Sequence, residues 1–200
     1  MSGDRAFPTG TVTMLFTDVE GSTRLLKQLG DRYGGMLAEH RRLLREASAA
    51  HGGREMDAQG DAFFVAFSRA RNAVEAAVEA QRALAAQAWP DGVECRVRMG
   101  LHTGEPAVGE EGYHGMGVHR GARICAAGHG GQILLSNTTR ELAEDELPAG
   151  AAEHVRGSAP HRGIDRLADL HHLEYAESAR LAAHCATPSP ARRSRDQEFR

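Results

Sequence analysis

The sequence predicts an α+β fold with a ferredoxin-like βαββαβ core, and two observations support this prediction. Short apolar or alternating segments, typical of strands, are interspersed with longer segments whose apolar residues recur at helical spacing. Their order is strand, helix, two strands, helix and strand, which places helices on one face of a mainly antiparallel sheet. A chain of 200 residues without an internal repeat is expected to form one domain.

Each expected strand is a short apolar or alternating run bounded by turn residues. The first is the run that ends at Asp18, and the next two are joined by Gln59-Gly60 as a hairpin. Of the last region, 151–175, only its end alternates clearly. The expected strands cover residues 11–17, 54–58, 62–67, 93–102, 132–136 and 170–175.

The expected helices follow from apolar spacing, caps and stop signals. The first begins at Ser22 or Thr23, with a break at Gly30 or Gly34-Gly35, and stops at His51-Gly52-Gly53. Ser68 is the expected cap of the second, which ends before Trp89-Pro90. Asn137 is the expected cap of the last helix. The expected helices cover residues 23–50, 69–88, 116–127 and 138–145.

Composition excludes several functional classes. A net charge of -3 lacks the basic excess of a nucleic-acid-binding protein, and no apolar run approaches the ~20 residues of a membrane span. Three cysteines without metal-ligand spacing indicate a reducing compartment, and residues 1–9 lack a signal-peptide core. We therefore expect a cytoplasmic domain over residues 10–176, with a flexible N-terminus at 1–9 and a disordered polar tail at 177–200.

Two carboxylates occupy informative places in this pattern. Asp18 ends the first strand, and Asp61 begins the third, after one intervening helix and the second strand. Each could simply cap a helix or a turn. Together, however, they can meet at one edge of the sheet, beside a Gly-Ser-Thr turn at a helix start and near several arginines. Carboxylates and helix-start amides in this arrangement are suited to Mg²⁺ and polyphosphate.

Four segments carry a specific resemblance: FTDVEGSTRLL, HGGREMDAQGDAFFVAF, RVRMGLHTGEP and GYHGMGVHRGARICAAGHGGQILLS. As a set they resemble the catalytic domain of class III adenylyl and guanylyl (nucleotidyl) cyclases, closely over residues 10–145 and weakly over 146–175. The resemblance implies that Asp18 and Asp61 bind two Mg²⁺ or Mn²⁺ ions per site, helped by the Val19 carbonyl. It further implies a phosphate-binding set of Glu20, Gly21, Ser22, Thr23 and Arg98.

The same resemblance implies a head-to-tail homodimer with active sites at its interface. In the family, the ribose 3′-oxygen attacks the α-phosphorus of the nucleoside triphosphate and releases pyrophosphate. Arg123 matches the arginine that stabilises charge in that transition state. His119 occupies the position of the asparagine that orients the ribose, and an imidazole offers fewer hydrogen bonds than an amide.

The positions that select the purine also depart from the family. Asp57 stands where adenylyl cyclases have lysine and guanylyl cyclases have glutamate, and Gly112 stands at the partner position. A carboxylate accepts hydrogen bonds from guanine, which favours GTP, whereas ATP is the commoner substrate in the family. Lys27 is the only lysine, so the late phosphate-contacting lysine is missing too, with Ala168 in its place. A weakly active or inactive nucleotide-binding module that regulates a partner therefore remains the alternative to a cyclase.

Overall fold

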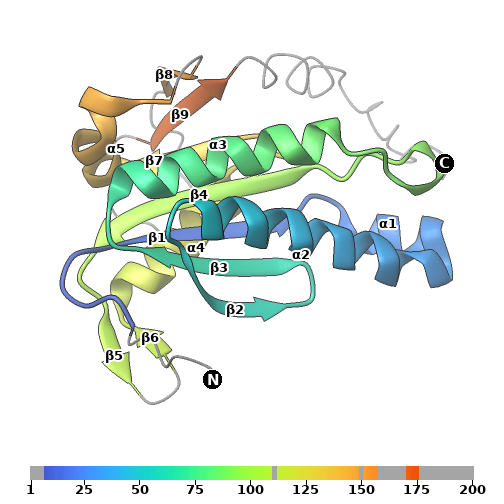
Figure 1. The fold of residues 1–200 in the computed structure, drawn as a ribbon, viewed down its shortest axis with the longest axis horizontal. Coiled ribbons are helices and arrows are strands. Elements are labelled where there is room, and N and C mark those ends of the chain that lie inside the picture. The colour runs from blue at the N-terminus through green and yellow to red at the C-terminus, as the bar shows by residue number, and fades with distance from the viewer. Residues whose placement is uncertain (1–6, 110–111, 149–150, 157–169, 176–200) are drawn as a thin grey trace, which may run out of the picture.

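A computed structural model describes residues 7–109, 112–148, 151–156 and 170–175. Within them lie a seven-stranded sheet of order β2-β3-β1-β4-β7-β9-β8 and a two-stranded sheet of β5 and β6 (Figure 1). In the larger sheet, β1 lies antiparallel between β3 and β4, and β2 pairs antiparallel with β3. The central order β2-β3-β1-β4 is that of the ferredoxin-like arrangement, so the predicted fold is confirmed. The strands are β1 (Val12–Val19), β2 (Arg54–Gln59), β3 (Ala62–Phe67), β4 (Val97–Gly104), β5 (Ala107–Gly109), β6 (Gly112–His114), β7 (Ile133–Ser136), β8 (Ala151–Arg156) and β9 (Leu170–Tyr175).

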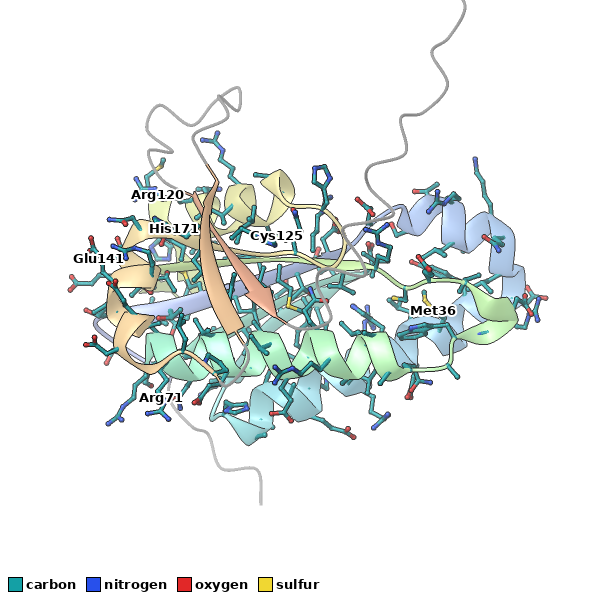
Figure 2. The ribbon with its side chains drawn as sticks, turned by 90° about the horizontal axis from the view of Figure 1, so that it is seen from above. Met36, Arg71, Arg120, Cys125, Glu141 and His171 are labelled. Carbon is teal, nitrogen blue, oxygen red and sulfur yellow. The ribbon has the colours of Figure 1, made fainter. Side chains whose placement is uncertain are left out.

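The helices cover both faces of the large sheet unequally. Figure 1 shows α2 and α3 running across one face, and Figure 2 shows α4 on the opposite side. None of the helices in the described ranges is long and apolar enough to cross a membrane. The helices are α1 (Ser22–Leu29), η1 (Gly30–Arg32), α2 (Tyr33–Ala50), α3 (Ala70–Ala86), η2 (Pro90–Gly92), α4 (Met116–Ala127), α5 (Asn137–Ala143) and η3 (Glu144–Glu146).

Alternation along the strands divides the core between the two faces. On β1, Leu15 and Val19 belong to the large apolar cluster beneath α2 and α3. Met14, from the other face, belongs to a small cluster in which Phe16 and Phe64 are partly buried. Because α4 covers only part of this second face, the aromatic side chains beyond it remain available to line a site.

Most elements lie where they were expected, and the differences have local causes. The long helical region breaks at Gly30, whereas Gly34 and Gly35 lie inside α2, whose buried side chains hold the helix against the sheet. Residues 93–96 precede β4 instead of belonging to it, and the 106–113 connection contains most of the β5–β6 ribbon. The expected side-chain caps are wrong: Gly21 and Arg69 precede α1 and α3 without capping bonds, and Ser136, not Asn137, caps α5 by accepting the Thr139 amide.

Two glycines allow α4 to lie close to the sheet. A Cβ atom at Gly100 of β4 would lie 2.2 Å from the backbone nitrogen of Cys125. A Cβ atom at Gly121 of α4 would lie 2.4 Å from the ring of Phe16. Gly121 is therefore a packing requirement, although glycine lowers intrinsic helix stability by about 1 kcal/mol relative to alanine. This packing fixes α4 against the end of β1 that carries Asp18.

Candidate active site

The end of β1 and the start of β3 bring the two predicted carboxylates together. Asp18 is the penultimate residue of β1, and Asp61 lies in the tight β2–β3 turn. The Val19 amide donates a hydrogen bond of 3.3 Å to Asp61 Oδ2, which links the turn to the residue after Asp18. Both aspartates are partly exposed. The predicted convergence of Asp18, Val19 and Asp61 at one edge of the sheet is therefore present.

Arg98 lies directly opposite Asp18 in the antiparallel β1–β4 register. Its Nε donates a hydrogen bond of 2.7 Å to Asp18 Oδ2, and its Nη2 donates to the same oxygen. Each side chain is 31% exposed, so water reaches the ion pair. Arg98 thus pairs with Asp18 Oδ2 and leaves the second carboxylate oxygen, Oδ1, outside the ion pair.

The predicted phosphate-binding segment forms the turn into α1. Gly21 has φ of +70°, a left-handed conformation that favours glycine, and Ser22 and Thr23 begin the helix. The first amides of a helix have no acceptor within it, so those of Ser22 and Thr23 can bind an anion. The Glu20 side chain instead lies beside two basic residues, with its carboxylate oxygens 3.9 Å from Arg96 Nε and 3.8 Å from His129 Nδ1.

A hollow of about 570 Å³ lies on the α4 side of the sheet, and its lining includes Thr17 and Ala62, the chain neighbours of Asp18 and Asp61. Phe16 and Phe64 stack there with ring centroids 4.3 Å apart. Both predicted base-selecting residues line it, Asp57 on β2 and Gly112 on β6. Four further lining residues share no motif, although each lies within two residues of a predicted site position: Met56, Gln59, Tyr113 and Val118.

A smaller hollow of about 240 Å³ joins the carboxylate end of β1 to α4. Asp18 and Arg98 line one side, and Ala122 and Cys125 line the other. Burial raises the pKa of the Cys125 thiol to about 12, and the charge of Asp18 adds to the effect. Cys125 is therefore a neutral wall of this hollow at physiological pH.

Two predicted catalytic residues lie on the outer surface of α4. Whereas Gly121 and Cys125 are buried, His119 and Arg123 are exposed, one helical turn apart. Neither lines the hollows that hold Asp18 and Asp57. A single chain therefore groups the carboxylates and the base-selecting positions but leaves these two side chains on an outward face.

Sequence matching decides the family. Residues 5–166 match the family described as the adenylate and guanylate cyclase catalytic domain. The chain belongs to this family. The cyclase domain is also 38% identical over 161 residues to an uncharacterised protein of Mycobacterium tuberculosis, an alignment that covers 80% of this chain and 54% of that protein. The chain thus spans about half the length of that relative. An adenylate cyclase of Podospora anserina is 31% identical over 155 residues, which cover 65% of this chain and 7% of the fungal protein.

Solved structures support the same fold for the cyclase domain. The guanylate cyclase domain of RhGC from Catenaria anguillulae, in complex with GTP, has a TM-score of 0.75 and 16% identity, over 85% of this chain and 99% of that one. An adenylate cyclase from Trypanosoma brucei in its monomeric state has a TM-score of 0.72 and 24% identity, over 85% and 90% of the two chains. At these identities the comparison supports the fold, and the chemistry must be argued from the site.

The donor atoms of the cyclase domain fit a hard divalent cation. Asp18 and Asp61 supply carboxylate oxygens, which Mg²⁺ and Mn²⁺ prefer, while Mg²⁺ usually keeps waters and substrate phosphates as its other ligands. Among the described residues there is no cluster of three or more histidine, cysteine or acidic side chains that could hold a metal by itself. A metal in this site would therefore have the two carboxylates as its protein ligands, and phosphate oxygens of a bound nucleotide would add to them.

Proposed function

We propose that this chain is a Mg²⁺- or Mn²⁺-dependent nucleotidyl cyclase that converts ATP or GTP into the 3′,5′-cyclic nucleotide and pyrophosphate. The observation that supports it best is the approach of Asp18 and Asp61 beside the first turn of α1. Two carboxylates next to free helix amides suit a metal-bound triphosphate. Neither a purely structural turn nor a nucleic-acid-binding surface requires this combination.

The reaction joins the ribose 3′-oxygen to the α-phosphorus while the bond from that phosphorus to the pyrophosphate oxygen breaks. Two divalent ions, when bound, would lower the pKa of the attacking hydroxyl and balance charge on the leaving pyrophosphate. Asp18 and Asp61 would hold these ions, and the amides of Ser22 and Thr23 would bind the terminal phosphates. Arg98 would release Asp18 and bind the triphosphate instead. Such positioning and charge stabilisation account for most of the catalysis in phosphoryl transfer.

The complete site, in this proposal, is shared by two copies of the chain. His119 and Arg123 lie on the exposed side of α4, where they can face the carboxylate edge of a partner copy. Arg123 would then stabilise charge at the α-phosphate, and His119 would hydrogen-bond the ribose. Solved cyclase domains of this fold include one described as monomeric and one described as a non-canonical dimer. In this proposal, the association of two copies is the step that would create activity.

The larger hollow would hold the purine. Phe16, Phe64 and Tyr113 supply apolar surface for a planar ring, and Asp57 and Gln59 supply polar atoms at its margin. Gly112 adds no side chain, and a Cβ there would approach only Met56, at 4.0 Å. The Asp57 carboxylate favours guanine because it accepts hydrogen bonds from N1–H and the 2-amino group. Solved structures of this fold include a guanylate cyclase domain in complex with GTP and a guanylyl cyclase core of converted specificity in complex with ATPαS.

A nucleotide-binding module without turnover is the second candidate. Asp18 is held by Arg98, His119 replaces an amide, and Gly112 offers no contact to the base. These features favour a domain that binds a nucleotide and signals through a partner. With either function, the proposed substrates and the unpaired, buried Cys95 and Cys125 favour a cytoplasmic location.

Product formation separates the two candidates. Purified protein is incubated with ATP or GTP and with Mg²⁺ or Mn²⁺, and cyclic nucleotide and pyrophosphate are quantified. We expect metal-dependent product that falls by at least about 100-fold in Asp18→Ala. Asp31→Ala removes an exposed aspartate of η1 and is the matched control, expected to retain activity. Nucleotide binding without product would favour the module, and equal product from Asp18→Ala and the unchanged chain would remove the cyclase proposal.

A further inference from the structure

A side chain of α2 contacts the tight β2–β3 turn that contains Asp61. Arg41 of α2 donates a hydrogen bond of 2.5 Å from Nη2 to the carbonyl oxygen of Gly60. This carbonyl belongs to the peptide bond between Gly60 and Asp61. The hydrogen bond therefore restrains the orientation of the backbone that carries the Asp61 side chain. Gly60 itself has φ of +56° and is exposed, so neighbouring side chains contribute little to holding the turn.

The hydrogen bond that the Asp61 side chain accepts is a weak one. This bond from the Val19 amide is 3.3 Å long, beyond the usual range for N–H···O bonds. Hydrogen bonds to charged donors are about twice as strong as neutral ones, and the guanidinium of Arg41 is such a donor. The Arg41–Gly60 bond is therefore the stronger of these two restraints on the position of the second carboxylate.

The charge of Arg41 also acts on Tyr33, a residue that the charge of Asp61 affects as well. Burial raises the pKa of Tyr33, and the charges of Asp61 and Arg41 change the same pKa in opposite directions, which places both charges near one phenol. The Nε atom of Arg41 is buried and has no hydrogen-bond partner among the described residues. Burying an unsatisfied donor is unfavourable, so the side chain is held in this pose by its contact with the turn.

Arg45, one helical turn further along α2, provides a comparison. Its guanidinium makes two bonds of 2.7 Å with Glu55 of β2 and lies 5.7 Å from the Phe63 ring centroid. Both arginines therefore connect α2 to the same hairpin. Only Arg41 contacts the turn that leads into Asp61.

We propose that Arg41 is a positioning residue that holds Asp61 in the geometry needed for divalent-cation binding. The proposal rests on the cyclase function proposed above. The bond holds the backbone that carries a metal ligand, and loss of a hydrogen bond that orients a metal ligand typically weakens metal affinity by about 10- to 100-fold. Arg41 needs no contact with the substrate for this role.

The test measures Mn²⁺ binding by electron paramagnetic resonance, with Mn²⁺ alone as the probe and no nucleotide. We expect Arg41→Ala to weaken Mn²⁺ binding about tenfold and Arg41→Lys, which retains one donor, to restore most of it. Arg45→Ala is the matched control and should change binding by less than about twofold, since it loosens the same hairpin away from Asp61. Circular dichroism confirms that each variant is folded.

Amide hydrogen exchange in the metal-free protein tests the same restraint without any ligand. The Val19 amide, which donates to the Asp61 carboxylate, should exchange faster in Arg41→Ala than in Arg45→Ala. Equal exchange in the two variants, or Mn²⁺ binding by Arg41→Ala within about twofold of the unchanged chain, would overturn the proposal. If the unchanged chain binds no Mn²⁺ while exchange still separates the variants, the metal-dependent function fails but the restraint by Arg41 stands.

Discussion

Replacing Gly100 by alanine should disturb the packing of β4 against α4, and through it the candidate active site. The added Cβ would lie 2.2 Å from the nitrogen and 2.6 Å from the Cα of Cys125, both backbone atoms of α4. An ordinary carbon contact is about 3.5 Å, so α4 must move outward by about 1 Å or β4 must bend. A flexible side chain could rotate away from such a contact, but a helix backbone cannot.

The size of the effect follows from that displacement. Overpacking a filled core usually costs about 1–3 kcal/mol, and a clash between two backbones belongs at the upper end, so we expect a loss of about 3 kcal/mol. The same shift moves His119 and Arg123 relative to the site that they would complete. A misplacement of about 1 Å can lower a rate by about 100-fold, so activity should fall even where the protein stays folded.

Urea unfolding followed by circular dichroism, together with the cyclase assay, measures both effects. Gly34→Ala is the control, because this exposed glycine of α2 has no atom within 4 Å of an added Cβ. It should stabilise the protein by up to about 1 kcal/mol through helix propensity. Unchanged stability and activity in Gly100→Ala would show that the described contact between β4 and α4 is not the one present in solution.

Two further predictions concern pH and base choice. Burial lowers the pKa of His40 to about 4 in the folded protein. The unfolded chain takes up this proton near pH 6.5. The free energy of unfolding is therefore higher above that pH, by about 3 kcal/mol, and this difference is lost as pH falls toward 4. His40→Leu should therefore weaken the pH dependence of the urea midpoint between pH 7 and 5, and an unchanged dependence would contradict this. Asp57→Lys should raise the ratio of cyclic AMP to cyclic GMP, because an ammonium group donates to adenine N1 and repels the guanine donors. A constant ratio would place the purine outside the hollow that Asp57 lines.

Sequence patterns were sufficient for the framework of the site. Asp18 and Asp61 end or begin apolar strands, and strand pairing brings such positions together at one edge. The α4 boundaries, Met116–Ala127, also agree with the prediction, because Gly115 and Gly128 flank the helical pattern. These features depend on local periodicity and on strand order, which the sequence encodes directly.

Features that depend on side-chain pairing across the fold were not predictable. The bond between Arg98 and Asp18 depends on the β1–β4 register, and the bond from Arg41 to Gly60 depends on how α2 crosses the hairpin. The packing of Gly121 against Phe16 joins residues far apart in sequence, so the helical pattern alone does not predict it. The predicted tail at 177–200 lies outside the described residues.

The central claim is that one active site combines carboxylates from one copy with Arg123 from another. Asp61→Ala and Arg123→Ala chains are each expected to be inactive alone. When they are mixed, a heterodimer regains one intact site of its two, so random pairing should restore about a quarter of the unmodified activity. Recovery near that value supports the shared site, whereas isolated heterodimers that stay as inactive as either parent would contradict it.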